Sequence, residues 1–193
     1  MMEPTLETGT LAGLFHRLVR SAMRAQGIPA SEHTEVYLVQ LLTAFARPAH
    51  SDLLAPPLGV DYLTALTLPA SQRFGKLRRV ADTALFLTGL FLEYVENTAV
   101  GARYYATLGR TAYGHLVAAA PHGGLATSFG ELYRRFEDFV RVLGEIADTE
   151  LFRSDRDTIR IYRRWLLTRG PREADQLMRR GVIPFRPPSD TRH

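Results

Sequence analysis

Apolar side chains recur every three or four residues along most of the chain, which is the spacing of amphipathic α-helices. One expected helix ends near Gln26, and its apolar face carries Leu11, Leu14, Phe15, Leu18, Val19, Ala22 and Met23. Gly27 is the expected stop of this helix, because glycine readily adopts the left-handed conformation that ends many helices. The sequence contains no alternating apolar and polar run of useful length for a β-strand. The pattern therefore predicts an all-α fold.

Further start and stop signals predict a compact bundle of about six or seven helices. Ser31 is the expected N-cap of a second helix, which Pro48 ends. The Pro-rich connection that follows is expected to hold one helical turn near residues 61–66. The third and fourth long helices are expected over about 71–95 and 102–120. We expect a single helical domain and an extended C-terminal tail, over residues 1–181 and 182–193 respectively.

The C-terminal part of the chain carries three more helix signals. The run "SFGE" (Ser128–Glu131) matches a capping box, in which two backbone donors are satisfied reciprocally, and predicts the start of a fifth long helix. A sixth helix is expected over 155–170. Pro171 suits the first position of a short last helix, which Gly181 is expected to end.

Composition places the chain among globular proteins and excludes several classes. Its 193 residues can bury a substantial core, and its 46% hydrophobic and 23% charged residues argue against disorder. The absence of cysteine excludes disulfides, thiolate metal sites and cysteine nucleophiles. The acidic N-terminus lacks the positive region of a signal peptide. The longest apolar run, about residues 80–92, is shorter than the roughly 20 residues that a bilayer-spanning helix needs. We therefore expect no membrane span and a cytoplasmic protein.

Positive charge gathers toward the C-terminus. The net charge is +4, and residues 150–193 hold 11 arginines against six acidic residues. A candidate surface for an anionic partner consists of Arg160, Arg163 and Arg164, which lie beside Tyr162 and Trp165. Such residues can bind phosphate and stack on bases. The alternative is a solvated arginine face next to an apolar stripe. Because acidic residues are interspersed, we predict no tight nucleic-acid binding.

The run "RRVADTALFLTGLF", residues 78–91, places Asp82 within an apolar helix. A buried carboxylate is costly unless it is paired. Arg78 and Arg79 precede Asp82 by four and three residues, within reach on the same helix. Asp82 could thus be ion-paired or cap a neighbouring helix. It could also be an acid with a shifted pKa in an internal pocket, or a solvent-exposed residue near the helix start.

The fourth expected helix carries several aromatic hydroxyls and a histidine, His115, which we expect to be half buried. Together with the Asp82 segment, these suggest a pocket between the third and fourth long helices. The candidate pocket residues are Asp82, Arg79, Tyr105, Tyr113 and His115. Gly89 in mid-helix costs roughly 1 kcal/mol relative to alanine, so we expect another helix or a ligand to approach it closely.

Motifs for metal and cofactor chemistry are missing from the sequence. No histidine lies in an H-x-x-x-H, H-E-x-x-H or E-x-x-H pattern. Phosphate-binding glycine loops and the G-x-S-x-G nucleophile elbow are also missing. We therefore expect no metal and no cofactor, and the sequence favours a non-enzymatic role.

Three runs resemble a pattern found in bacterial proteins of about this length: "LRRVADTALFLTGLF", "RYYATLGRTAYGHL" and "YRRWLLTRG". The resemblance covers most of the chain from residue 70 onward. It implies a bacterial, cytoplasmic, all-helical protein in which Asp82, Tyr105 and Tyr113 belong to the recurring pattern. It implies no activity, cofactor or site.

Three hypotheses for function follow. The first is a non-enzymatic helical interaction or scaffold module that binds another protein or itself. A homodimer is one form of it, because Leu53, Leu54 and Leu58 add apolar surface near the Pro-rich connection. The second is a small-ligand-binding or enzymatic bundle that uses the candidate pocket, and a cavity of about 300 Å³ beside Asp82 would favour it. The third is nucleic-acid binding through the arginine-rich C-terminal helices.

Overall fold

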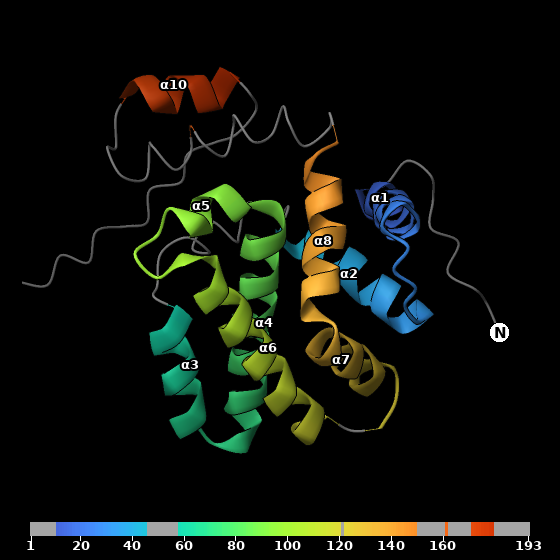
Figure 1. The fold of residues 1–193 in the computed structure, drawn as a ribbon. Helices are drawn as coiled ribbons and strands as arrows, with labels where there is room; N and C mark the ends of the chain where they lie inside the picture. Colours follow the sequence, from blue (N-terminus) through green and yellow to red (C-terminus); the bar gives the residue numbers. More distant parts are fainter. Residues whose placement is uncertain (1–10, 46–57, 121, 150–160, 162–170, 180–193) are drawn as a thin grey trace, which may run out of the picture. The chain divides into compact units, whose positions relative to one another are not determined.

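A computed structural model describes residues 11–45, 58–120, 122–149, 161 and 171–179. These residues form nine helices and no strand, which confirms the all-α prediction (Figure 1). Residue contacts divide the chain into two units, residues 1–147 and 148–193, and each is described by itself. The expectation of a single domain over residues 1–181 stays a prediction.

The first unit contains eight of the described helices. They are α1 (Leu11–Gln26), α2 (Glu32–Phe45), α3 (Leu58–Thr67), α4 (Ala70–Leu90), α5 (Leu92–Glu96), α6 (Gly101–Ala119), α7 (Gly124–Arg134) and α8 (Phe136–Ala147).

The turn between α1 and α2 follows the sequence prediction. Gly27 has a φ of +63°, and the backbone N–H of Ile28 donates to the carbonyl of Met23 over 2.9 Å, which closes the end of α1. The Ser31 hydroxyl accepts a hydrogen bond from the backbone N–H of Thr34 over 3.3 Å. Ser31 therefore caps α2 as expected.

Two long helices are interrupted where the sequence predicted continuity. The expected helix over 71–95 is divided at Phe91, whose φ of −131° and ψ of 42° separate α4 from α5. The expected helix start at Ser128 was wrong, because α7 already begins at Gly124 and Arg135 separates it from α8. The Ser128 hydroxyl donates to the carbonyl of Gly124 one turn earlier, so it satisfies a bond inside the helix instead of capping it.

A complete helix replaces the single turn expected after the Pro-rich connection. α3 has ten residues, and Leu58 and Ala65 are its buried side chains. Leu58 was expected to add exposed apolar surface, and this expectation was wrong because Leu58 faces the interior. Pro48, Leu53 and Leu54 lie outside the described residues.

α4 lies at the centre of the first unit and packs against α3, α6 and α8 (Figure 1). α1 packs on α2 and α8, while α7 packs on α2 and α6. Close approach depends on glycines in two helices. A Cβ at Gly89 would lie 2.9 Å from Cδ1 of Leu143 on α8, and one at Gly109 would lie 2.7 Å from Cβ of Ala84. The close approach of α8 therefore explains why position 89 is a glycine, and it confirms the first of the two interpretations, the approach of another helix.

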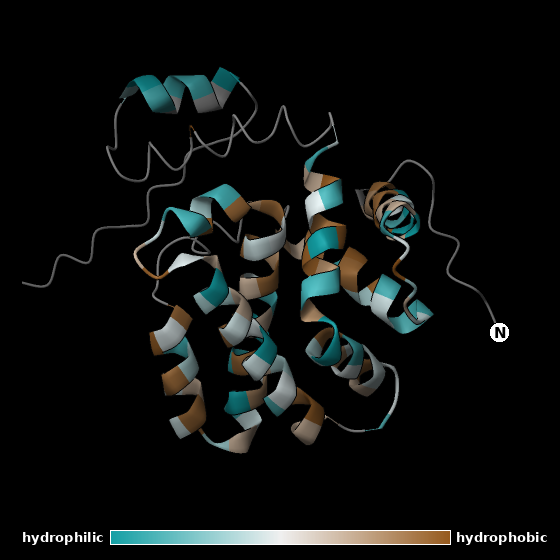
Figure 2. Ribbon diagram, in the orientation of Figure 1, coloured by the Kyte–Doolittle hydropathy of each residue, from teal (hydrophilic) through white to brown (hydrophobic). Residues whose placement is uncertain are grey.

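The second unit contains α10 (Pro171–Arg179), which begins at Pro171 as predicted. Most of α10 is coloured as hydrophilic in Figure 2. The other predictions for this end of the chain lie outside the described residues, apart from residue 161: the helix over 155–170, the stop at Gly181, the tail over 182–193, and the surface formed by Arg160, Arg163 and Arg164.

Candidate functional site

The Asp82 carboxylate joins three helices. On α4, its Oδ1 accepts one hydrogen bond from the hydroxyl of Tyr37 on α2 over 2.5 Å and another from the hydroxyl of Tyr113 on α6 over 2.7 Å. Its Oδ2 lies 3.5 Å from Nε of Arg78, one turn earlier on α4. The side chain of Asp82 is 15% exposed. The charged group is therefore largely enclosed and bound on both oxygens, as expected for a paired aspartate.

Arg78 contacts Tyr37 as well as Asp82. Its Nε donates to the Tyr37 hydroxyl over 3.1 Å, and its guanidinium carbon lies 5.0 Å from the centre of the Tyr37 ring. The Tyr37 hydroxyl thus donates to the carboxylate and accepts from the guanidinium. Together the four side chains form a closed polar cluster, which we call the Asp82 cluster: Tyr37, Arg78, Asp82 and Tyr113.

Aromatic side chains enclose this cluster. The ring of Phe129 on α7 lies 5.5 Å from that of Tyr37, edge to face, and 5.9 Å from that of Tyr113. Phe136 on α8 lies 6.2 Å from the Tyr113 ring. Tyr113, Phe129 and Phe136 are fully buried. These rings limit the access of water, so the polar contacts act in a medium of low dielectric constant.

Burial controls the protonation of the cluster. It raises the pKa of Asp82 to about 6, although the hydrogen bonds from Tyr37 and Tyr113 and the charge of Arg78 all lower it. Burial and the neighbouring carboxylate raise the pKa of both tyrosine hydroxyls far above the ordinary range. Both phenols therefore keep their protons and donate them to Asp82.

The structure brings together two of the five candidate pocket residues, Asp82 and Tyr113. Arg79 is exposed, and the arginine that pairs with Asp82 is Arg78. The i,i+4 spacing places Arg78 on the same side of α4 as Asp82, toward α2, where it also reaches Tyr37.

The other two candidates lie elsewhere on α6. Tyr105 is half buried, and this burial raises the pKa of its hydroxyl. The hydroxyl is hydrogen-bonded to the side chain of Thr98. His115 is exposed, so the expectation of a half-buried histidine was wrong. Its Nε2 lies 3.0 Å from the hydroxyl of Tyr62 on α3. Tyr105 and His115 therefore lie on α6 but outside the Asp82 cluster.

Tyr37 was missed by the sequence analysis. It lies in the run "EVYLVQLL", where the neighbouring side chains are apolar and Tyr37 itself is buried. A buried tyrosine usually hydrogen-bonds through its hydroxyl, so a tyrosine in such a run was a signal for a buried polar partner. No local spacing could identify the partner, because Tyr37 and Asp82 are 45 residues apart in the chain.

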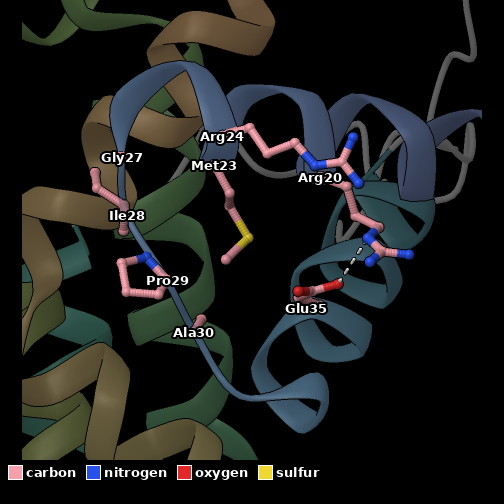
Figure 3. A pocket seen from close by; sticks show the side chains of 8 residues that line it. All are labelled: Arg20, Met23, Arg24, Gly27, Ile28, Pro29, Ala30 and Glu35. Atoms are coloured by element: carbon pink, nitrogen blue, oxygen red, sulfur yellow. Dashed lines mark ion pairs between the residues drawn. The ribbon is translucent and has the colours of Figure 1, made fainter.

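A pocket of about 330 Å³ opens at the turn between α1 and α2 (Figure 3). Met23 and Ile28 form its apolar floor, and Arg20 and Arg24 lie at its rim. Nε of Arg20 lies 3.5 Å from the carboxylate of Glu35. None of the candidate pocket residues of the sequence analysis lines this pocket.

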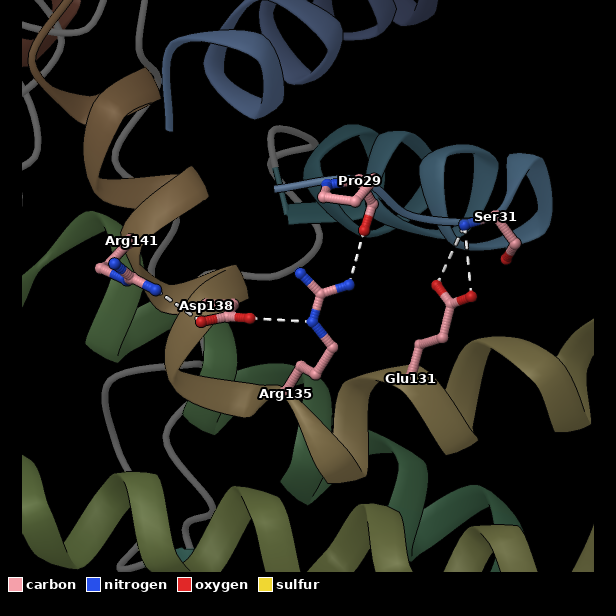
Figure 4. Close-up of polar contacts among 6 residues, drawn as sticks. All are labelled: Pro29, Ser31, Glu131, Arg135, Asp138 and Arg141. Atoms are coloured by element: carbon pink, nitrogen blue, oxygen red, sulfur yellow. Dashed lines mark hydrogen bonds and ion pairs between the residues drawn. The ribbon is translucent and has the colours of Figure 1, made fainter. Parts of the chain in front are cut away.

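Glu131 of α7 and Arg135, which lies between α7 and α8, hold the backbone of this turn (Figure 4). The Glu131 carboxylate accepts a hydrogen bond from the backbone N–H of Ser31 over 3.1 Å, so Glu131 caps α2 rather than its own helix. Arg135 donates from Nη1 to the carbonyl of Pro29 over 2.6 Å and pairs with Asp138 over 2.8 Å. The backbone on either side of Ala30, at Pro29 and at Ser31, is therefore held by two long-range contacts.

α3 presents an uncharged face to solvent. Val60 and Leu63 are 57% and 63% exposed, and Thr64 and Thr67 are also exposed. The Thr64 hydroxyl donates to the carbonyl of Val60, and that of Thr67 donates to the carbonyl of Thr64. Because both hydroxyls are used within the helix, the threonines present their methyl groups. We call this surface the α3 stripe: Val60, Leu63, Thr64 and Thr67.

The opposite face of α3 is anchored to the bundle. Asp61 lies 2.6 Å from Nζ of Lys76 on α4, and the Tyr62 hydroxyl contacts His115 on α6. The Tyr104 hydroxyl lies against Gly59, where a Cβ would overlap it. α3 runs alongside α4 and α6 in Figure 1, and these contacts fix which of its faces is exposed.

Three findings hold within the described part of the chain. Every buried polar side-chain atom there has a hydrogen-bond partner. No group of three or more histidine, aspartate or glutamate residues there is arranged to hold a metal ion. None of the helices described is both long enough and apolar enough to cross a bilayer.

Comparison of the chain with known protein families, with curated proteins and with solved structures finds no match. The function is therefore inferred from the residues and contacts described above.

Proposed function

We propose that this chain is a non-enzymatic helical interaction module that binds another protein chain through the α3 stripe. The observation that carries the proposal is the exposure of Val60 and Leu63, three residues apart on one face of an anchored helix. Helices that bind protein grooves or other helices use apolar residues at this spacing. The cytoplasmic, bacterial setting expected from the sequence is part of the proposal.

Burial of the stripe supplies a driving force for binding. Complete burial of a valine or leucine side chain contributes roughly 1.5–3 kcal/mol, and more than half of each of these side chains is exposed. The two threonines add methyl groups without adding unsatisfied hydroxyls. A partner surface can therefore cover the stripe without a large desolvation cost.

The Asp82 cluster supports a structural role for its polar residues. Oδ1 of Asp82 already accepts two hydrogen bonds, and Oδ2 faces Arg78. The donors come from three helices of the same bundle, so the carboxylate stabilises their relative positions. The arrangement favours an interaction module over a pocket that uses Asp82 as an acid.

Site-specific photo-crosslinking in the native host tests the proposal. A photoreactive phenylalanine analogue placed at Leu63 should yield a crosslinked product, whereas the analogue at Ser21, an exposed position on α1, should yield none. Adding Val60→Glu should remove the product, because a buried carboxylate would be costly at the interface. Equal crosslinking from Leu63 and Ser21 would contradict the proposal.

Small-ligand binding is the second candidate, and the pocket between α1 and α2 favours it. The apolar floor at Met23 and Ile28 and the guanidinium of Arg24 suit an aromatic anion. The dye 8-anilinonaphthalene-1-sulfonate should then fluoresce with the native protein and lose this signal in Arg24→Ala. Fluorescence that is unchanged in Arg24→Ala would reject this site. Nucleic-acid binding stays the third hypothesis.

A further inference from the structure

We infer that the α3 stripe binds the α3 stripe of a second copy of this chain, with the two helices antiparallel. The inference rests on the proposed function and names its partner. It concerns the four residues of the stripe, which lie outside the Asp82 cluster and the α1–α2 pocket.

The chemistry of the stripe selects an uncharged partner. Its exposed side chains carry no formal charge, and the hydroxyls of Thr64 and Thr67 already donate within α3. A charged partner surface would lose its hydration and gain no counter-charge in return. A second α3 stripe carries the same uncharged isopropyl, isobutyl and methyl groups, so it meets this requirement.

The spacing of the stripe makes it self-complementary. Its residues occupy positions i, i+3, i+4 and i+7, which lie along one face of a helix. In an antiparallel two-fold pair, Leu63 of each copy meets Thr64 of the other, and Val60 meets Thr67. Antiparallel helices also place opposite ends of their dipoles together, which favours this direction over the parallel one. A two-fold pair uses the same patch on both chains and therefore closes without forming a fibre.

The size of α3 limits the strength of the pair. A helix of ten residues is about 15 Å long, and its stripe is smaller than a standard protein interface. We expect a reversible dimer that is detected at protein concentrations on the order of 100 µM.

Sedimentation equilibrium of the purified chain is the first test. The native chain should show a concentration-dependent dimer, and Leu63→Glu should be monomeric at the same concentrations. Ser21→Glu, at an exposed position on α1, should dimerise like the native chain. Unchanged circular dichroism and thermal unfolding of Leu63→Glu would show that its fold is retained. A native chain that stays monomeric, or a dimer that Leu63→Glu leaves intact, would overturn the inference.

Engineered cysteines supply the second test, because the chain has none of its own. A mixture of Val60→Cys and Thr67→Cys chains should form the mixed disulfide on mild oxidation. Val60→Cys alone should crosslink poorly, since an antiparallel pair separates the two copies of residue 60 by roughly 10 Å along the helix axis. Ser21→Cys is the control and should not crosslink. Efficient crosslinking of Val60→Cys to itself would overturn the antiparallel arrangement.

The two proposals can fail separately. If the purified chain is monomeric but the analogue at Leu63 captures a different protein in the host, the interaction module stands and self-pairing is wrong. If neither experiment detects contact at the stripe, both are wrong.

Discussion

The hydroxyl of Tyr37 lies 2.5 Å from Oδ1 of Asp82, although the two residues are 45 positions apart in the chain. The contact joins α2 to α4, and the neighbouring bond from Tyr113 joins α6 to the same oxygen. A single carboxylate oxygen thus links three helices. Four predictions test this cluster and the packing beside it.

Asp82→Ala should destabilise the protein by about 3 kcal/mol at neutral pH. The change leaves the buried hydroxyls of Tyr37 and Tyr113 without their acceptor, and each unsatisfied donor costs about 1–3 kcal/mol. Urea unfolding followed by circular dichroism measures the loss. Asp138→Ala is the control, because its ion pairs lie at the surface and should contribute less than about 1 kcal/mol. Equal losses in the two variants would contradict a special role for Asp82.

Tyr37→Phe should destabilise the protein by about 1–2 kcal/mol, because it removes a donor to Asp82 and an acceptor for Arg78 while it keeps the aromatic packing. Tyr62→Phe removes an exposed hydroxyl that contacts His115 and should change stability by less than about 0.5 kcal/mol. Urea midpoints of the two variants give the comparison. A neutral Tyr37→Phe would mean that the Tyr37 hydroxyl adds nothing to stability.

Stability should rise as the pH falls through about 6. The pKa of Asp82 is about 6 in the folded protein and 3.8 in its ordinary state, so the folded protein binds this proton more tightly than the unfolded chain. Protonation of Asp82 contributes its full stabilisation below the pKa that Asp82 has in the unfolded chain. This stabilisation is lost as the pH rises through the pKa of Asp82 in the folded protein. The difference corresponds to about 3 kcal/mol.

The pH effect is isolated by comparison with Asp82→Asn, which has no proton to bind at this position. Free energies of unfolding from urea titrations between about pH 4 and pH 7.5 should change more steeply in the native protein than in the variant. Asp138 acts in the opposite direction, because the hydrogen bonds from Arg135 and Arg141 lower its pKa, but its effect is common to both proteins. Identical pH profiles would contradict the raised pKa of Asp82.

Two glycines of α4 should respond in opposite directions to alanine. Gly89→Ala places a methyl group 2.9 Å from Cδ1 of Leu143, and overpacking of this kind costs typically 1–3 kcal/mol. Gly75→Ala enters open space on the same helix and should stabilise the protein by about 0.5–1 kcal/mol through helix propensity. Thermal unfolding of the two variants measures both effects. Stabilisation by Gly89→Ala would refute the close contact with α8.

The helical class and several helix ends follow from the sequence because they depend on local physics. Apolar spacing, the N-cap at Ser31, the left-handed Gly27 and the first-turn Pro171 involve side chains and backbone within one or two turns. The ion pair between Asp82 and Arg78 is also a local feature, since both residues lie on one face of α4. Such features need no knowledge of the remaining chain.

The tertiary structure alone decided where polar groups find distant partners and which faces remain exposed. Tyr37 binds Asp82, and Glu131 caps α2 instead of its own helix, because helix packing brings together segments 45 and 100 residues apart. The outward face of α3 likewise depends on neighbours that no local pattern identifies. Sequence periodicity shows that a helix has an apolar face. Which apolar residues are then buried depends on how many neighbouring helices contact it, and on α3 this leaves Leu58 inside while Val60 and Leu63 face solvent.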